Sequence, residues 1–353
     1  MLTRDTIPDP TPLYQVRDGI YAGDLLIAAV TDLDLFSWLA EHGPVCAADL
    51  VADLHLSARP TDVLLTYCAA LGLIERDIRA DDRITITDLA RHHLAAGSAY
   101  DLRAYYQSLA ERPAVTELGR VLRTGEQAPW ASSTTHRGTS APAGDWSGRL
   151  SDLAFATQIT AAMDARSAFL GPALAHTIED LPINALLDVA GSTGAYARAI
   201  LDRHPYARAA VLERAPVDTA ARTLLRERGW DDRLQVITGD MFHDALPRGY
   251  DGHLYSHVLH DWDAQRVEQL LKASFDALPS GGWLIDHDTH INRDKRGPRP
   301  IAEYSVLLMH STPGKCWSIG ELADIAHKVG FIDVTHRPTV GDRSVVLAHK
   351  PNH

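Results

Sequence analysis

The sequence predicts an α/β protein of two domains, with a nucleotide-binding domain in its C-terminal half. The main observation is the order strand, loop of small residues, helix, strand and acid between residues 185 and 213. The second is a helix-rich stretch over residues 14–75 that runs into a hairpin-like pattern. A chain of 353 residues is long enough for two domains that each bury a core.

The segment that predicts nucleotide binding begins with the apolar run Ala185–Val189, which ends in a loop of small residues. Tyr196–Arg203 then has a helical pattern, and a second apolar run, Ala209–Leu212, ends in Glu213. Small residues let the backbone approach a ligand closely. An acid that closes the second strand can accept hydrogen bonds from both hydroxyls of a ribose. The segment therefore predicts a βαβ unit that binds a nucleotide.

The loop itself, D-V-A-G-S-T-G from Asp188 to Gly194, lacks the G-x-G-x-x-G pattern of dinucleotide sites. It resembles motif I of S-adenosylmethionine (SAM) dependent methyltransferases, D/E-x-G-x-G-x-G. Gly194 is the one patterned glycine kept, and Ala190 and Ser192 replace the other two. An ordinary tight turn between a strand and a helix is the alternative for the loop taken alone.

The segments that follow the loop strengthen the resemblance. A short strand pattern, Leu234–Ile237, leads into G-D-M-F at 239–242. In the methyltransferases an Asp here binds the adenine amino group and the next Met packs on the ring. The motif H-D-W follows at 260–262, and a turn into a buried strand follows at 278–285. The resemblance implies a Rossmann-like SAM-binding domain with seven strands, and these cofactor-binding residues: Asp188, Gly191, Gly194, Glu213, Asp240, Met241 and Phe242.

Composition narrows the class of partners. A net charge of −12 disfavours nucleic acid, because phosphate binding needs a basic surface. No apolar run approaches the ~20 residues of a membrane span. The N-terminus lacks the pattern of a secretory signal, and three scattered cysteines form no disulfide framework. We therefore expect a cytoplasmic protein that binds neither nucleic acid nor a membrane.

The N-terminal region has the pattern of a winged helix. Its expected elements are four helices, at 21–29, 32–41, 47–52 and 59–65, and a hairpin over residues 71–87. Such domains often bind DNA, so a DNA-binding or SAM-sensing regulator is the rival hypothesis. The would-be recognition helix is mostly apolar and carries one positive charge, Arg59, which makes it a poor reader of a major groove.

A winged helix of this kind joined to a SAM domain resembles the small-molecule O-methyltransferases, the caffeate-type family and its bacterial relatives. In that family the N-terminal domain forms the homodimer, and the resemblance implies the same role here. We expect a dimerisation domain at 1–110, connecting helices and a loop at 111–174, and the SAM-binding domain at 175–353. The loop is expected over residues 126–150, which are rich in Ser, Thr, Gly and Pro.

The expected catalytic residues belong to the H-D-W motif. A phenol or enol must lose its proton before it attacks the SAM methyl group, and a histidine of near-neutral pKa is the usual base. The resemblance assigns this role to His260, and Asp261 is expected to orient the ring. It implies methylation of oxygen on a small, aromatic acceptor of the natural-product type.

The acceptor pocket is expected to take its walls from two helical regions. The helical pattern of residues 150–170 supplies Phe155 and Met163, although each also fits a core stripe. The other wall candidates lie further along the chain, at Met309, His310 and Trp317.

One departure from the family concerns the residue that braces the catalytic histidine. The family has a Glu soon after Gly-Lys, whereas here Cys316 follows Gly314 and Lys315. Glu303 or Asp288 are the candidate substitutes. Because of this departure, methylation at carbon, either ortho to a phenol or alpha to a keto group, stays the alternative to O-methylation.

Histidines are unusually frequent in the C-terminal half, among them those at 257, 260, 287, 290 and 310. His260, Asp261 and His310 could form a metal site of two histidines and one carboxylate, as in some bacterial C-methyltransferases that act on α-keto acids. A histidine before Gly-Lys also occurs in caffeate-type enzymes, and the chain has no close-spaced ligand motif. We therefore expect catalysis without a metal.

Overall fold

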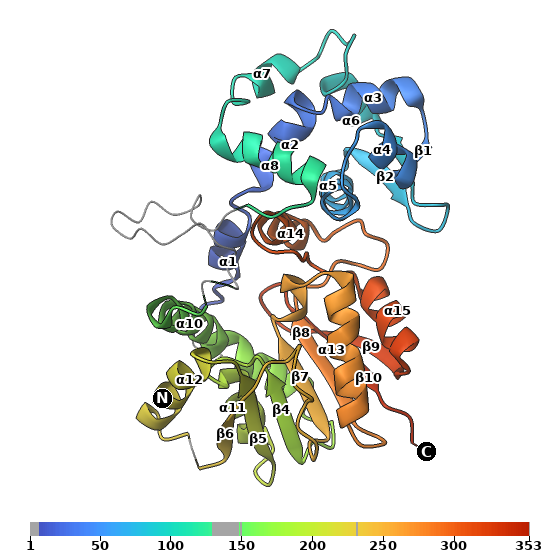
Figure 1. Cartoon of the computed structure of the whole chain (residues 1–353). Helices are drawn as coiled ribbons and strands as arrows, with labels where there is room; N and C mark the ends of the chain where they lie inside the picture. The colour runs from blue at the N-terminus through green and yellow to red at the C-terminus, as the bar shows by residue number, and fades with distance from the viewer. Residues whose placement is uncertain (1–6, 129–147, 149, 231, 353) are drawn as a thin grey trace. The chain divides into compact units, whose positions relative to one another are not determined.

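The computed structural model describes residues 7–128, 148, 150–230 and 232–352. The chain forms two compact units (Figure 1). The sheet unit comprises Met1–Thr11, Trp146–His290 and Glu321–His353, and the helical unit comprises Pro12–Asp145 and Ile291–Gly320. Most of the loop predicted at 126–150 lies outside the described residues.

The sheet unit is built on seven strands in the order β6-β5-β4-β7-β8-β10-β9. The first five are mutually parallel, and β10 is antiparallel to both of its neighbours. This confirms the predicted Rossmann-like domain of seven strands. The strands are β4 (Ala185–Val189), β5 (Arg208–Glu213), β6 (Leu234–Thr238), β7 (Gly252–Ser256), β8 (Trp283–Asp288), β9 (Ile332–Pro338) and β10 (Ser344–His349).

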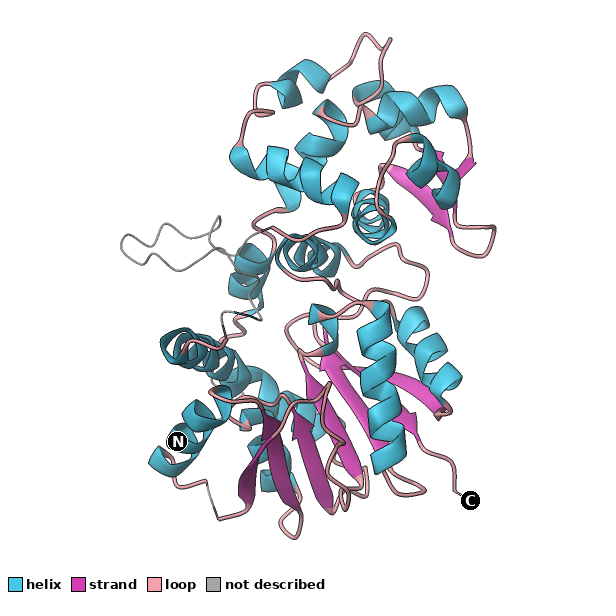
Figure 2. Ribbon diagram, in the orientation of Figure 1, coloured by secondary structure: helices cyan, strands magenta, loops and turns pink. Residues whose placement is uncertain are grey.

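Helices flank this sheet (Figure 2). The longest, α10, is capped by Asp152, whose carboxylate accepts hydrogen bonds from the backbone N–H groups of Ala154 and Phe155. It extends beyond the predicted end at residue 170 and continues through Pro172. The helices are α10 (Leu153–Thr177), α11 (Ala195–Arg203), α12 (Val217–Glu227), the 3-10 turn η3 (Leu259–Asp261), α13 (Ala264–Ala277) and most of α15 (Ile319–Val329).

The parallel strands bring the ends of β4, β5, β6, β7 and β8 to one edge of the sheet. Val189 is paired with Leu212, Glu213 with Thr238, and Ser256 with His287. The loops that leave these strands therefore gather at their carboxyl ends, where open α/β sheets bind ligands.

The helical unit contains the predicted winged helix. The four predicted helices and the hairpin are all present, and the small sheet has the order β1-β3-β2 with antiparallel pairs. The elements are α1 (Thr11–Asp18), α2 (Ala22–Thr31), α3 (Leu35–His42), β1 (Val45–Cys46), α4 (Ala47–Asp53), α5 (Ala58–Ala70), β2 (Ile74–Asp77), β3 (Arg83–Ile86), α6 (Asp88–His93), α7 (Arg103–Gln107), α8 (Pro113–Thr124) and α14 (Arg299–Ser311).

The helix α14 shows that the domain division differs from the one expected. It buries Ile301, Ala302, Val306 and Met309 in the same apolar core as α2, α3 and α5. Residues 291–320 therefore belong to the helical unit, although the sequence predicted one continuous domain from 175 to the end. This insertion was not predicted, because β8 before it and β10 after it pair directly with each other in one sheet.

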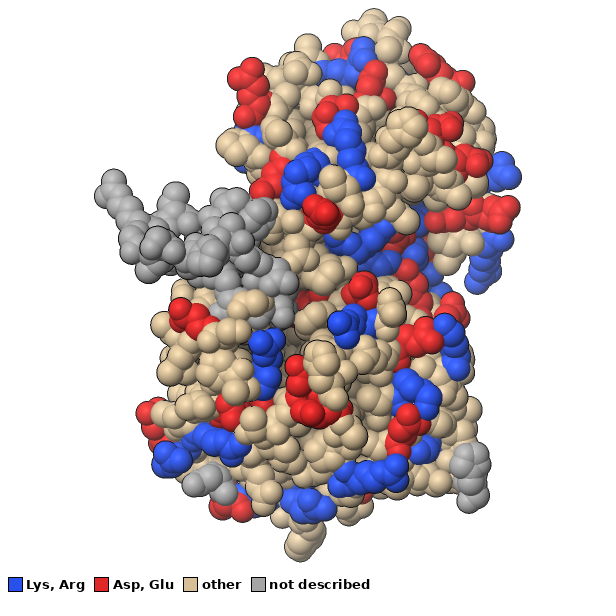
Figure 3. All heavy atoms as spheres, in the orientation of Figure 1, with Lys and Arg blue, Asp and Glu red and all other residues tan. Residues whose placement is uncertain are grey.

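Arg59, the positive charge of the would-be recognition helix, is hydrogen-bonded within the helical unit. One guanidinium nitrogen of Arg59 donates to the backbone carbonyls of Met309, Thr312 and Gly314, and the other donates to Gly125. Lys and Arg side chains lie among Asp and Glu side chains on the face that Figure 3 shows. Of the helices described, none has the length and apolar character to cross a membrane.

Candidate active site

A cavity of about 330 Å³ lies in the sheet unit, lined by α10 and by the segments after β4, β5, β6 and β7. Five of the seven predicted cofactor residues line it. They are Gly191, Glu213, Asp240, Met241 and Phe242.

The other two predicted cofactor residues, Asp188 and Gly194, are not among the lining residues but shape the loop from within. A Cβ on Gly191 would lie 2.2 Å from the Asp188 carboxyl carbon. Gly194 has φ +68°, and a Cβ there would lie 2.6 Å from Leu234. Gly191 is therefore required by the close packing of the Asp188 carboxyl group, and Gly194 by its left-handed backbone and the neighbouring Leu234 side chain. Direct contact of Asp188 and Gly194 with the cofactor stays a prediction.

The two non-glycine residues of the loop are held in the left-handed region. Ala190 has φ +53° and Ser192 has φ +54°. These are the positions where the methyltransferase motif has glycine, so the loop keeps the motif's backbone shape at a conformational cost. The N–H of Ser192 donates to Oε1 of Glu213 at 2.8 Å, which joins the loop to the end of β5.

Glu213 is a buried acid at the wall of the cavity. Burial raises its pKa to about 7, against the opposing effect of the hydrogen bonds from the N–H groups of Ser192 and Arg214. Burial and the charge of Glu213 likewise raise the pKa of Asp188 to about 8. A ligand that donates hydroxyl hydrogen bonds to Glu213 would stabilise its charged form.

The loop after β6 forms another part of the cavity wall. Oδ1 of Asp240 accepts a hydrogen bond from the N–H of Phe242 at 2.8 Å, and Nδ1 of His243 lies 3.1 Å from Oδ2. The rings of Phe242 and Trp262 meet edge to face, with centroids 4.6 Å apart. The result is an oriented carboxylate beside an apolar wall, which suits a flat heterocycle with an amino group.

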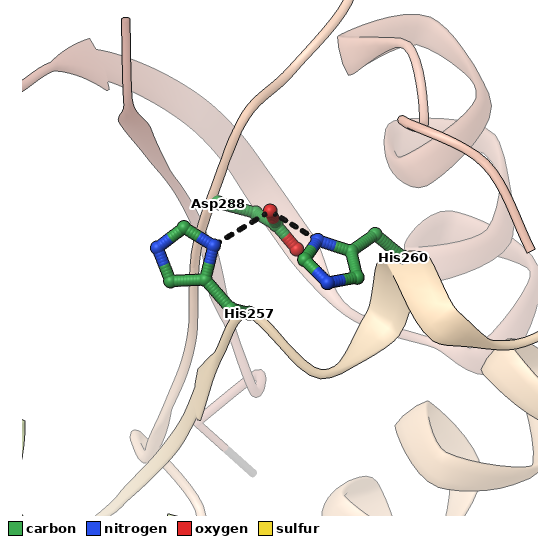
Figure 4. A group of neighbouring side chains, drawn as sticks. All are labelled: His257, His260 and Asp288. Atoms are coloured by element: carbon green, nitrogen blue, oxygen red, sulfur yellow. Dashed lines mark hydrogen bonds and ion pairs between the residues drawn. The ribbon is translucent and has the colours of Figure 1, made fainter. Parts of the chain in front are cut away.

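The predicted base, His260, lies in η3 and is buried (Figure 4). Its Nδ1 is 2.7 Å from Oδ1 of Asp288, at the end of β8. Asp261 was expected to orient the ring, but its Oδ1 lies 3.7 Å from the other ring nitrogen, Nε2. Asp288 therefore makes the short hydrogen bond, because the pairing of β7 with β8 brings its carboxylate beneath the η3 turn.

The charges around His260 decide its protonation. Burial alone would lower its pKa, but the carboxylates of Asp288 and Asp261 outweigh burial and raise the pKa above 6.5. Burial raises the pKa of Asp261 to about 6. Burial would raise the pKa of Asp288, but the nearby His260 and His257 lower it more strongly, so the pKa of that carboxyl lies well below its ordinary value. Asp288 is thus the charged partner of the ring.

The structure adds His257, which the sequence analysis noted only as one of several histidines. Its Nδ1 lies 3.3 Å from the same Oδ1 of Asp288, and its side chain lines the cavity. The residue has φ +56°, and its pKa is lowered well below 6.5, mainly by burial. The available signal was the position of His257 directly after β7, because residues that follow parallel strands gather at the carboxyl edge of the sheet.

The predicted wall residues of α10 behave differently from each other. Met163 lines the cavity beside Ile159 and Arg166, whereas Phe155 is buried elsewhere and is not among the lining residues. Eight residues along a helix correspond to a rotation about 80° away from a whole number of turns. Phe155 and Met163 therefore face different directions.

The remaining predicted residues belong to the helical unit. Nε2 of His310 is 2.8 Å from Glu117, and the His310 ring stacks on Tyr21 with centroids 4.1 Å apart. Met309 and Trp317 are buried in the same unit. Their role as acceptor walls stays a prediction, and the metal set of His260, Asp261 and His310 stays the alternative that the sequence did not favour.

The position of the missing family Glu is occupied by a cysteine, which has no carboxylate to hold a histidine. Cys316 is buried and its backbone N–H donates to Oγ of Ser305 at 3.1 Å. Glu303 pairs with Arg299 at 2.7 Å. Of the two candidate substitutes, Asp288 is thus the one that contacts His260.

Comparisons with known proteins agree with this geometry. The family model of the O-methyltransferase domain matches residues 117–332, and that of the O-methyltransferase dimerisation domain matches residues 14–96. A similar curated protein is the 3-hydroxy-5-methyl-1-naphthoate 3-O-methyltransferase of Streptomyces sahachiroi. It is 29% identical over 330 residues, which are 92% of this chain and 90% of that protein.

Solved structures are similar over nearly the whole chain. An O-methyltransferase family 2 protein from Planctomyces limnophilus, in complex with apigenin, is 30% identical with a TM-score of 0.83. The match covers 97% of this chain and 96% of that one. The structure of PigF with SAH is 25% identical with a TM-score of 0.54, and the match covers 94% of this chain and 96% of that one.

Proposed function

The chain belongs to the O-methyltransferase family and is a SAM-dependent methyltransferase, and on that premise we propose which group it methylates and how. The acceptor in this proposal is a hydroxyl on a small aromatic natural product, and His260 is the general base. The naphthoate enzyme and the apigenin complex support an aromatic acceptor. The observation that carries the mechanism is the hydrogen bond of 2.7 Å between His260 Nδ1 and Asp288.

The proposed donor site is the cavity of the sheet unit. Glu213 would accept the ribose hydroxyls, and Asp240 would accept the adenine amino group beside Met241 and Phe242. The fit rests on two observations. Glu213 is buried with acceptor capacity beyond two backbone hydrogen bonds, and Gly191 leaves no space for a side chain over Asp188.

The proposed reaction needs one proton acceptor and one in-line displacement. A carboxylate only accepts hydrogen bonds, so the contact with Asp288 places the ring hydrogen of neutral His260 on Nδ1 and leaves Nε2 as the acceptor. Nε2 takes the hydroxyl proton, and the oxygen attacks the SAM methyl group. The sulfur keeps the electron pair of the bond that breaks, so the products are the methyl ether, S-adenosylhomocysteine and a protonated His260.

In this mechanism Asp288 is a positioning residue. It fixes the tautomer of His260 and stabilises the imidazolium that forms, as the carboxylate does in a Ser-His-Asp triad. Asp261, which lines the cavity and lies 3.7 Å from Nε2, adds a second negative charge near the proton that is transferred.

The direct test is methyl transfer from SAM to a panel of phenols by wild-type protein and by His260→Ala. With the wild type we expect a product heavier than the phenol by the mass of one methylene group. For the variant we expect a loss of about 10²- to 10⁴-fold in kcat/KM. Binding of S-adenosylhomocysteine, measured by calorimetry, serves as the control for folding. A variant that keeps full turnover would remove His260 from the mechanism.

Transfer to carbon is the second candidate, favoured by Cys316 at the position where the family has its bracing Glu. The same deprotonation serves both reactions, because a phenolate or enolate attacks through either atom. The ¹³C chemical shift of a labelled methyl group in the product distinguishes a methoxy group from a methyl group on carbon.

The proposed assembly is a homodimer formed through the helical unit. Leu13 and Val16 are exposed apolar residues three positions apart on α1, and Ile20 is exposed in the turn that follows; the three are 73%, 77% and 57% exposed. Tyr105, 75% exposed, adds to the apolar surface. Exposed apolar surface of this kind marks an interaction site.

Light scattering on the purified protein tests the assembly. We expect a dimer for the wild type, and a shift towards monomer when Leu13 and Val16 are both replaced by Ser. A wild-type protein that is monomeric at micromolar concentration would contradict the proposal.

A further inference from the structure

The structure holds a group of three potential metal ligands that the proposed reaction uses only in part. They are His257, His260 and Asp288, and one ligand atom from each lies within 4.8 Å of the others (Figure 4). It is the only such group among the residues that the structure describes. It differs from the set of His260, Asp261 and His310 considered from the sequence.

From this group we infer an inhibitory binding site for a zinc-like divalent ion, formed by His257, His260 and Asp288. Two imidazoles and one carboxylate are a common ligand set for Zn²⁺ and related ions. All three side chains are buried, so an ion here would be shielded from competing water.

The spacing of the ligand atoms fits a single ion. Two ligands bound tetrahedrally to Zn²⁺ lie about 3.3 Å apart, given bonds of about 2.0–2.1 Å. Oδ1 of Asp288 is 3.3 Å from Nδ1 of His257 and 2.7 Å from Nδ1 of His260. The same Oδ1 also accepts a hydrogen bond of 2.7 Å from the N–H of Thr289, which helps to orient the carboxylate.

His257 gives independent support for the inference. Its backbone is held at φ +56°, an unfavourable conformation for a histidine, and its N–H donates to the carbonyl of His287 at 2.9 Å. Both ring nitrogens are buried and neither makes a hydrogen bond to a described residue, although Nδ1 lies 3.3 Å from Oδ1 of Asp288. His257 also lines the cavity, which gives an ion a route to the group.

The inhibitory effect follows from the tautomer of His260. An ion bound at Nδ1 displaces the hydrogen that Nδ1 donates to Asp288, and the neutral ring then carries its hydrogen on Nε2. Nε2 can no longer accept the proton of the acceptor. The ion and the base function therefore exclude each other. This step rests on the proposed role of His260, whereas binding of the ion does not.

The test uses full-length protein that has been treated with a chelator and desalted. Co²⁺ is titrated while its visible absorption is followed, and Zn²⁺ is then added as competitor and as inhibitor of methyl transfer. For the wild type we expect one Co²⁺ per chain, displacement by Zn²⁺, and inhibition by Zn²⁺ over the same concentration range.

His257→Asn is the decisive variant, because Asn tolerates the left-handed backbone and lacks the imidazole. We expect the affinity of this variant for both ions to fall at least about tenfold. Inhibition by Zn²⁺ is measured relative to the variant's own rate without metal. His290→Asn is the matched control. His290 is also buried and lies 2.9 Å from a carboxylate, Asp286, but is outside the group, so metal affinity should stay that of the wild type.

Two results would overturn the inference: no Co²⁺ band with excess Co²⁺ on wild-type protein, or equal affinity in His257→Asn and the wild type. If His257→Asn does not fold, X-ray absorption of the Zn²⁺-loaded wild type decides, since fewer than two imidazole ligands contradicts the site. The proposed function is tested separately. If His260→Ala is active and the wild type binds the metal, the base is refuted and the metal site stands. If His260→Ala is inactive and the wild type does not bind the metal, the base stands and the metal site is refuted.

Discussion

At the scale of single residues, the account depends on how His260 is held. The H-D-W motif was enough to predict His260 as the base. Two acids, Glu303 and Asp288, were the candidates to replace the family's bracing Glu. Sequence could not choose between them, because Asp288 lies 28 residues from His260 and meets it only through the pairing of β7 with β8. His257 was missed as a neighbour of Asp288 for the same reason.

The first residue-scale prediction compares the two acids beside His260. Asp288→Asn removes the charge that fixes the tautomer and stabilises the imidazolium, so kcat should fall by about 10²-fold or more. Asp261→Asn should cost less, because Asp261 lies 3.7 Å from Nε2 and makes no short hydrogen bond to it. Steady-state kinetics with S-adenosylhomocysteine affinity as the folding control measures both. An equal or reversed order of the two losses would contradict the roles assigned here.

The second residue-scale prediction concerns pH. The base must be neutral, and its pKa is raised above 6.5 by Asp288 and Asp261 despite burial, so kcat/KM should rise with pH through that raised value. The same group stabilises the fold below pH 6.5, and this stabilisation is lost as pH rises through the raised pKa. Asp288→Asn should move the rise in kcat/KM to lower pH. A wild-type profile that is flat from about pH 6 to about pH 9 would rule out a titrating base.

At the scale of elements, the strands and helices of the sheet unit were predictable because their apolar periodicity is strong. Two features were not. The segment Arg299–Ser311 was expected in the C-terminal domain, but it forms α14 and packs in the core of the helical unit. This placement depends on the helices it packs against and cannot be read from the apolar pattern of the segment itself. Phe155 shares a helix with Met163 but faces another direction, because eight residues do not complete whole turns.

The element-scale prediction concerns the loop between β4 and α11. Ala190 is held at φ +53°, where glycine has no steric cost, so Ala190→Gly should leave the free energy of unfolding unchanged or raise it by up to about 1 kcal/mol. Ala273→Gly, inside α13, is the matched control and should lower that free energy by about 1 kcal/mol. Denaturant titration measures both. Equal destabilisation by the two substitutions would mean that the left-handed backbone at Ala190 carries no strain.

At the scale of the whole molecule, the fold class and the two kinds of domain were predictable, and the comparisons confirm the family. The division into units was harder, because the helical unit takes residues from both sides of the sheet unit in the sequence. The proposed class of the acceptor rests on the relatives, whereas the proposed proton transfer rests on the His260–Asp288 pair.

The central claim is that His260 removes the proton of the acceptor, and the acidity of the acceptor tests it most directly. A base is needed only when the hydroxyl is protonated at the assay pH. The measurement is the ratio of wild-type to His260→Ala kcat/KM for a series of ring-substituted phenols whose pKa values lie on both sides of that pH. We predict a loss of about 10²-fold or more for the weakly acidic phenols and little loss for those already ionised. A loss that is the same across the series would contradict the account.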